Sequence, residues 1–94
     1  MKFIINQKLY DTKKATLIAE GEKQFEEDSA FFGKIYPKRD VKLYKTQKGA
    51  FFYVYSKDYG TICAMAISED EAKSWLMYKA YDKYVELYGE LEEA

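Results

Sequence analysis

Residues 41–67, VKLYKTQKGAFFYVYSKDYGTICAMAI, contain three strand-like segments separated by two glycine-containing turns. Apolar and polar residues alternate in the first segment, whereas the second is densely aromatic, and both patterns are typical of β-strands. The third segment is an almost unbroken apolar run, which predicts a central strand or one covered by helices. The expected strands are 41–47, 50–55 and 61–67. Together they predict a three-stranded antiparallel meander.

A helix is expected directly after the third strand. Ser68 is a favourable N-cap, and Glu71 stands at the reciprocal position of a capping box. The acidic residues of this first turn also suit the positive end of a helix dipole. Apolar residues then recur at helical spacing, namely Ala72, Trp75, Leu76 and Ala80. A second short helix is expected from Asp82 to a C-cap at Gly89, followed by an acidic tail over 90–94.

The N-terminal residues carry signals for a hairpin and for a helix. Two short apolar runs within residues 2–10 are separated by Asn6-Gln7, which predicts a tight β-hairpin. Asp11-Thr12 is a suitable cap for a helix over 13–20. The apolar face of that helix would consist of Ala15, Ile18 and Ala19.

Residues 21–40 are expected to form a long loop or a frayed helix, because they contain Gly33 and the only proline, Pro37. Four residues within this segment are too apolar to stand free in solvent, namely Phe31, Phe32, Ile35 and Tyr36. They are expected either to cover the edge of the core or to contact a partner.

The whole chain, 1–94, is expected to form one domain. Its length suffices for a single modest core, and its 48% hydrophobic and 33% charged residues are typical of globular proteins. The predicted fold class is α+β, as a small single domain. It would consist of a three-stranded antiparallel meander packed by helices, with an N-terminal hairpin and helix.

The composition excludes several kinds of chemistry. The chain has no histidine and one cysteine, Cys63. Histidine-dependent acid–base catalysis, an intramolecular disulfide and a Cys/His zinc site are therefore excluded. Cys63 lies within an apolar run, which predicts a buried and unreactive thiol. We expect no catalytic residues, no metal site and no cofactor, and hence a protein that is not an enzyme.

Charge and hydropathy bear on partners and location. The net charge of -1 excludes a strongly basic nucleic-acid-binding protein. The lone cysteine suits a reducing compartment. The apolar run at the N-terminus is too short for a signal-peptide core, and no apolar run approaches the roughly 20 residues that span a bilayer. We therefore expect a cytoplasmic protein.

One stretch of the sequence combines basic and aromatic residues, and it supplies the candidate partner-binding site. Its members are Lys38, Arg39, Lys42, Tyr44, Lys45 and Lys48, with Tyr53 and Tyr55 as further anchors. Basic side chains beside aromatic rings suit an acidic protein groove or a nucleic-acid strand. A solvated strand face whose lysines discourage edge-to-edge association explains the same pattern. The acidic segment after residue 68 is an alternative binding surface, although capping and solubility also account for it.

Four segments carry a resemblance to a known family. They are MKFIINQKLYDTKKA at 1–15, LYKTQKGAFF at 43–52, ISEDEAKSW at 67–75 and YGELEE at 88–93. In these segments the chain resembles small proteins encoded by phages and mobile elements of Firmicutes. Some small proteins of this genomic type inhibit CRISPR-Cas or other host defences. The family offers no active-site residues to carry over.

This resemblance implies a non-enzymatic phage-type inhibitor in the host bacterial cytoplasm. Such an anti-CRISPR-like protein would bind a Cas nuclease or its guide complex and block nucleic-acid engagement. Two alternatives remain open. One is a small nucleic-acid-binding accessory or regulatory protein of a mobile element. The other is a self-associating structural domain that forms a homodimer.

Overall fold

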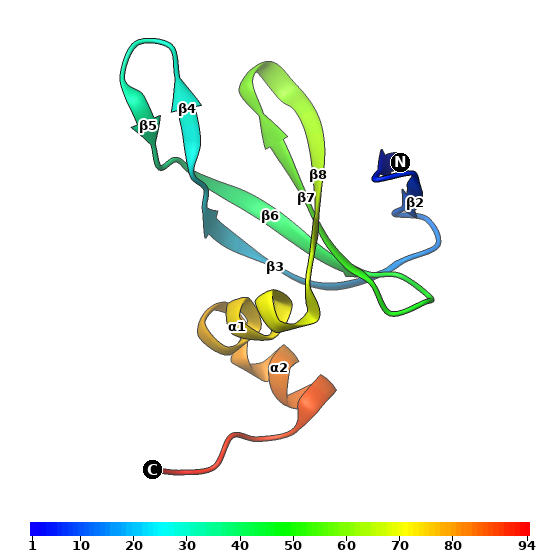
Figure 1. Ribbon diagram of the computed structural model, residues 1–94. Coiled ribbons are helices and arrows are strands. Elements are labelled where there is room, and N and C mark those ends of the chain that lie inside the picture. The colour runs from blue at the N-terminus through cyan, green and yellow to red at the C-terminus, as the bar shows by residue number, and fades with distance from the viewer.

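The computed structural model describes the backbone of residues 1–94 and the side chains of all of them except Tyr59. The expected α+β class is confirmed, since the described residues form antiparallel sheets and two α-helices (Figure 1). The elements are β1 (Lys2–Ile5), β2 (Lys8–Asp11), β3 (Thr16–Gln24), β4 (Glu27–Ser29), β5 (Gly33–Ile35), β6 (Lys38–Lys45), β7 (Phe51–Lys57), η1 (Asp58–Gly60), β8 (Thr61–Ile67), α1 (Glu69–Lys79) and α2 (Tyr81–Tyr88).

The largest sheet in the described part of the chain has four antiparallel strands, in the order β3-β6-β7-β8. The sequence predicted a sheet of three strands, and β3 adds the fourth along the outer side of β6. Strand β7 is an inner strand, and its residues Phe51 to Val54 are buried. Strand β8 lies at the edge and is at most half-buried, Cys63 included. The apolar run at 61–67 therefore did not indicate a central strand.

The helix expected over 13–20 is wrong, because this segment is a tight turn followed by strand β3. The Asp11 carbonyl oxygen accepts a hydrogen bond from the Ala15 N–H at 3.0 Å, which closes a single turn. The pairing of β3 with β6 then shifts register at Ile18, which is a β-bulge. Ile18 and Ala19 consequently both pack into the same core, although they are neighbours in a strand. The helical spacing of Ala15, Ile18 and Ala19 therefore results from a turn followed by a bulged strand.

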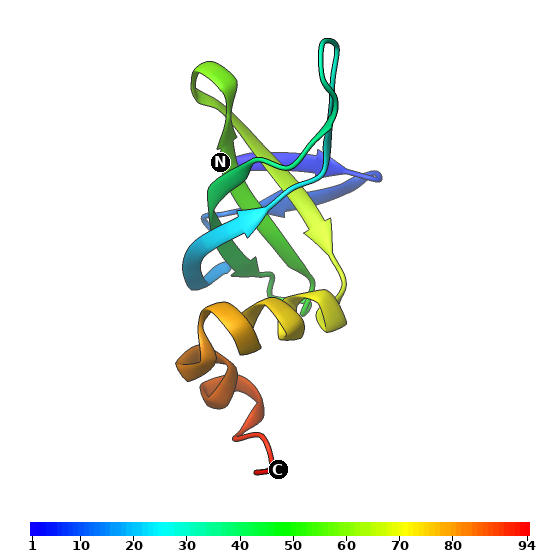
Figure 2. The ribbon, with the colours of Figure 1, turned by 90° about the vertical axis from the view of Figure 1, so that its left-hand side faces the viewer.

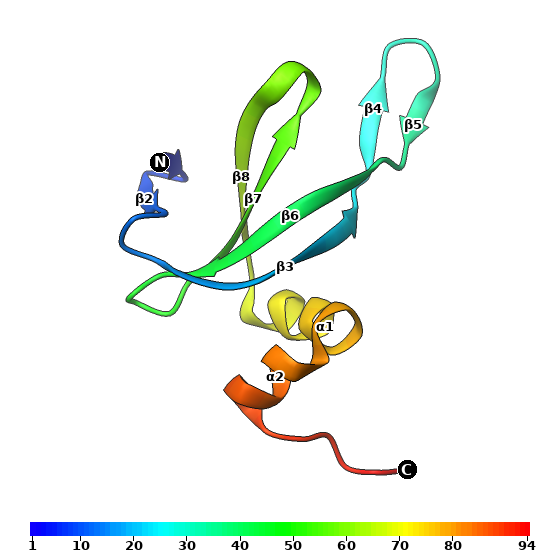
Figure 3. The same cartoon turned by 180° about the vertical axis from the view of Figure 1, so that it is seen from behind.

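The long loop or frayed helix expected over 21–40 is also wrong. Strand β3 pairs with β6 as far as Lys38. Beyond that point the Phe25 N–H donates to the Pro37 carbonyl oxygen at 2.9 Å, and β4 then pairs with β5. Residues 25–37, called the arm below, therefore form a two-stranded ribbon that projects from the end of the sheet (Figures 1 and 3).

Helix α1 covers one face of the four-stranded sheet, and α2 packs beneath α1 (Figure 2). The core on this side joins fully buried side chains of the sheet, such as Leu43 and Tyr53, to Leu76 of α1. The Trp75 indole N–H reaches β3 and donates to the Glu22 carbonyl oxygen at 3.0 Å. The helix is thereby fixed to the strand that the sequence did not predict.

The N-terminal hairpin covers part of the opposite face, where it crosses the sheet (Figure 2). The expected β1–β2 pairing is confirmed. Asn6 and Gln7 both have positive φ, 50° and 66°, as a two-residue type I′ turn requires. Tyr10 of the hairpin meets Phe52 of the sheet edge-on, with ring centroids 5.2 Å apart. The sheet is therefore packed between a helix layer and a hairpin.

The helix boundaries follow the sequence signals. The Ser68 hydroxyl accepts a hydrogen bond from the Glu71 N–H at 3.1 Å, which confirms the predicted N-cap of α1. Helix α2 ends at Gly89, whose φ of 87° is favourable for glycine. The predicted start of α1 and the predicted end of α2 are therefore confirmed, whereas α2 begins at Tyr81 rather than at Asp82 and has no side-chain N-cap among the described residues.

Gly21 lies directly beneath the Trp75 ring. A Cβ atom at residue 21 would stand 3.0 Å from Cζ2 and 3.3 Å from Cη2 of Trp75. We expect Gly21→Ala to lower the free energy of unfolding by about 1–3 kcal/mol, because α1 must move to relieve the clash. Urea unfolding measures this loss. In a Trp75→Phe background, where those two ring atoms are absent, the loss should shrink; an equal loss there would show that the clash is not its cause.

Candidate functional site

The predicted binding residues do not share one surface. Along β6 alternate residues face opposite sides of the sheet, so Lys42 and Tyr44 lie on the hairpin side, whereas Arg39 and Lys45 lie on the helix side. Lys38 stands exposed at the start of β6, and Lys48 is exposed in the turn before β7. The candidate residues therefore do not form a single basic and aromatic face. They lie on both sides of the sheet, at the start of β6 and in the turn before β7.

Four of the candidate residues on β6 contact other side chains of the protein. The Tyr44 ring stacks on Phe52, with centroids 5.3 Å apart. The ammonium group of Lys45 lies 5.4 Å from the centroid of the Phe51 ring. Lys42 Nζ lies 3.7 Å from a Glu20 carboxylate oxygen, at the exposed surface. Arg39 forms a bidentate ion pair with Glu27, described below.

Tyr53 is not available as an anchor, because its side chain is 0% exposed. It lies in the core, where its ring meets Trp75 edge-on at 5.7 Å. Its hydroxyl has no hydrogen-bond partner among the described residues. Tyr55 is half-buried and packs against Phe25, with ring centroids 4.6 Å apart. Alternation along β7 explains both outcomes, since Phe51, Tyr53 and Tyr55 all face the helix side.

Burial raises the pKa of Tyr53 above its usual range, and the nearby Glu71 carboxylate raises it further. At alkaline pH the unfolded chain loses this proton before the folded chain does. The free energy of unfolding should therefore fall as the pH rises above about 10. Burial also raises the pKa values of Tyr55 and Tyr88, which add to the same dependence.

Replacement of the buried hydroxyl tests this account. We expect Tyr53→Phe to reduce the alkaline loss of stability and, at neutral pH, to raise the free energy of unfolding by up to about 1 kcal/mol, because an unpaired buried hydroxyl is removed. Urea unfolding between pH 7 and about pH 11 measures both effects. Tyr78→Phe, at an exposed site of α1, is the matched control. An unchanged alkaline slope in Tyr53→Phe would contradict the prediction.

The base of the arm is held by a largely buried ion pair. Arg39 Nε and Nη2 donate three hydrogen bonds of 2.9–3.1 Å to the Glu27 carboxylate. The two side chains are only 15% and 17% exposed. Lys57 Nζ of β7 lies 3.6 Å from the same carboxylate. Arg39 therefore fixes the arm to the sheet rather than facing a partner.

The tip of the arm presents two phenylalanines to solvent. Phe31 is 91% exposed and Phe32 is 82% exposed. The Ser29 hydroxyl accepts hydrogen bonds from both of their backbone N–H groups at 3.3 Å, and Gly33 closes the turn with a φ of 68°. Of the two alternatives expected for residues 31, 32, 35 and 36, covering the core edge is wrong for the two phenylalanines. Tyr36 is exposed as well, whereas Ile35 is half-buried. A contact with a partner stays a prediction.

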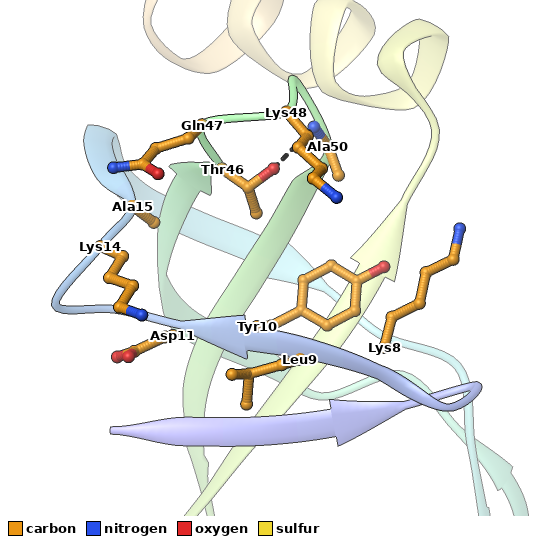
Figure 4. Close-up of a pocket in the computed structure, with 10 residues that line it drawn as sticks. All are labelled: Lys8, Leu9, Tyr10, Asp11, Lys14, Ala15, Thr46, Gln47, Lys48 and Ala50. Atoms are coloured by element: carbon orange, nitrogen blue, oxygen red, sulfur yellow. Dashed lines mark hydrogen bonds between the residues drawn. The ribbon is translucent and has the colours of Figure 1, made fainter.

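A second surface feature is an open groove of about 590 Å³ between the N-terminal hairpin and the β6–β7 turn (Figure 4). Three lysines line it, Lys8, Lys14 and Lys48. Sequence reasoning selected only Lys48, because the three residues belong to separate segments. No local pattern in the sequence indicates that these residues line one groove.

In the described part of the chain, no three acidic or cysteine side chains are grouped so that they could hold a metal ion. No helix among the described residues combines the length and apolar character that crossing a membrane requires. Comparisons with protein-family models, with curated proteins and with solved structures gave no match.

Proposed function

We propose that this protein is a non-enzymatic inhibitor of a bacterial defence effector, anti-CRISPR-like in its mode of action, and that it docks on that effector through the tip of the arm. The anti-defence assignment comes from the resemblance of the sequence to small phage and mobile-element proteins. The exposed pair Phe31 and Phe32 is the observation that carries the docking mode.

The chemistry of the tip favours an apolar pocket on a protein. Residues 29–33 are SAFFG and contain no charged side chain. A tip that inserts into a pocket removes two phenyl rings from water, and aromatic anchors of this kind dominate many protein interfaces. An uncharged tip offers nothing for the phosphate backbone of a nucleic acid.

The base of the arm lowers the cost of binding. The bidentate Arg39–Glu27 pair and the Phe25–Pro37 hydrogen bond hold the ribbon in one orientation. A partner then need not order a flexible loop, and less of the contact energy is lost as entropy. A projecting, preorganised ribbon also suits an inhibitor that blocks a surface sterically.

Affinity capture tests this proposal. The tagged protein is incubated with a Firmicutes lysate that expresses a Cas nuclease with its guide RNA, and captured proteins are identified by mass spectrometry. We expect stoichiometric recovery of the nuclease or of another defence protein, and inhibition of that effector in a purified assay. Recovery of the bait alone, with a concentration-dependent dimer in sedimentation, would replace the proposal with a self-associating domain. Capture of nucleic acid that washes off with salt would favour an accessory nucleic-acid-binding protein.

A further inference from the structure

The groove lined by Lys8, Lys14 and Lys48, called the lysine groove below, concentrates positive charge in a chain whose net charge is -1. Within the described side chains, none of the three lysines forms an ion pair within 4.0 Å. Asp11 is the acidic residue among those that line the groove, and it is 7% exposed. The Lys13 N–H donates to its carboxylate at 3.0 Å. The positive charge of the groove is therefore only partly compensated.

The walls of the lysine groove are built from two hydrogen-bonded turns. On one side the Asp11 carbonyl oxygen accepts from the Lys14 N–H at 3.1 Å. On the other side the Thr46 hydroxyl accepts from the Ala50 N–H at 3.0 Å, as the dashed line in Figure 4 marks. Thr46 and Ala50 also pair through the backbone. The backbone positions that carry Lys14 and Lys48 are consequently fixed before any ligand arrives.

Part of the groove lining is apolar. The Tyr10 side chain is 9% exposed and packs edge-on against Phe52. Leu9, Ala15 and Ala50 supply further apolar lining. A volume of about 590 Å³ lies within the range of small-molecule sites, roughly 300–1,000 Å³. The groove thus combines three lysines with an apolar part of its lining.

We propose that the lysine groove binds the phosphate groups of a nucleotide, with the base or sugar against the apolar lining. Lysine ammonium groups bind phosphate as point charges with freely rotating donors. The apolar lining beside them can contact a flat base. An inorganic anion has no such apolar group, so the apolar lining favours a nucleotide over inorganic phosphate. The nucleotide is either free or part of a single strand, and both share this chemistry.

This site goes beyond the proposed docking of the arm. Strand β6 starts at the base of the arm with Lys38 and ends with Lys45, next to the turn that carries Lys48. The arm and the β6–β7 turn, which forms one wall of the groove, therefore lie at opposite ends of this strand (Figures 1 and 3). Both sites can be occupied at once, and nucleotide binding is measurable on the isolated protein without any effector.

Titration of the purified protein with three probes tests the proposal: inorganic phosphate, ATP and a single-stranded thymidine decamer. Backbone amide shifts in NMR spectra report the site, and calorimetry reports the affinity. We expect shifts at residues 8–15 and 46–50, with ATP or the decamer binding at least 10-fold more tightly than inorganic phosphate. Comparable affinities of ATP and the decamer would identify a free nucleotide. A tighter decamer whose affinity falls steeply with salt would identify a strand.

The matched variants have equal net charge. Lys8→Gln, Lys14→Gln and Lys48→Gln together should weaken binding of the better probe at least 10-fold. Lys34→Gln, Lys38→Gln and Lys79→Gln together, which lie outside the groove, should weaken it less than about 2-fold at fixed salt. Circular dichroism confirms that both variants are folded. Three outcomes would overturn the proposal: equal losses in the two variants, no detectable binding, or tighter binding of a polyglutamate peptide than of ATP and the decamer. None of these results depends on an effector protein.

Discussion

The double variant Phe31→Ala, Phe32→Ala is expected to abolish capture of the effector, with a loss of affinity of about 100-fold or more. Each phenyl ring would enter a desolvated pocket, and truncation of such an anchor typically costs about 2 kcal/mol or more. The same variant should melt within a few degrees of the wild type, because the two side chains are 91% and 82% exposed and support no core. Surface plasmon resonance against the captured effector and thermal unfolding measure the two quantities.

The control for this variant is Tyr78→Ala. Tyr78 is 83% exposed on α1, so the replacement removes a comparably exposed aromatic ring at a distance from the arm tip. It should leave the affinity within about 2-fold of the wild-type value, since exposed positions outside an interface contribute little. An unchanged affinity of the double alanine variant would remove the tip from the docking model, even if the effector were confirmed.

The parts of the fold that were predicted correctly depend on local signals. Ser68 caps α1 through its neighbour three residues on, and Asn6-Gln7 turns the hairpin within two residues. Gly89 ends α2 by its own backbone conformation. Each of these signals is read from a few consecutive residues, because the interaction that it predicts closes within them.

The parts that were missed depend on pairing between distant segments. Strand β3 is stabilised by its pairing with β6. The bulge at Ile18 interrupts the alternation of β3, so its apolar residues have the spacing of a helix in the sequence. The arm forms because β3 and β6 continue past Phe25 and Pro37 as a ribbon, which outweighs the local turn preference of the proline. Register of this kind is set by the fold as a whole rather than by local propensity.

The candidate site shows the same division. The aromatic pair at 31–32 was noted as too apolar for a free loop, but its display on a ribbon required the pairing of β4 with β5. Lys8, Lys14 and Lys48 are separated in the sequence and line one groove only because the hairpin packs beside the β6–β7 turn. By contrast, proximity in the sequence made Arg39 and Lys42 look like one surface, although the sheet places them on opposite sides.

Loss of the ion pair at the base of the arm is the second large effect that we expect. Glu27→Ala leaves the Arg39 guanidinium largely buried without its carboxylate, and it also removes the partner of Lys57. Removing one member of a buried pair is strongly destabilising, because the remaining charge stays desolvated. We expect a loss of about 2–4 kcal/mol in the free energy of unfolding, measured by urea unfolding.

The comparison that isolates the buried pair uses the exposed pair on the same arm. Lys34 and Glu26 are 64% and 56% exposed, so Glu26→Ala should cost less than about 0.5 kcal/mol. The double variant Glu27→Leu, Arg39→Met should recover most of the stability, because neither side chain of the buried pair is then charged. Lys57 loses its partner as well, but its side chain is 46% exposed and stays solvated. A loss in Glu27→Ala no larger than that in Glu26→Ala would show that the pair does not stabilise the fold.

The ion pair also links stability to binding. If it holds the arm in one orientation, Glu27→Ala should speed hydrogen exchange at the Phe25 N–H, which bonds to Pro37 at the base of the ribbon. Affinity for the effector should then fall about 5- to 10-fold although both phenylalanines remain, because the partner must order the arm on binding. Faster exchange at Phe25 with an unchanged affinity would show that the rigidity of the arm does not contribute to its binding of the effector. Slower dissociation than in the wild type would contradict preorganisation directly.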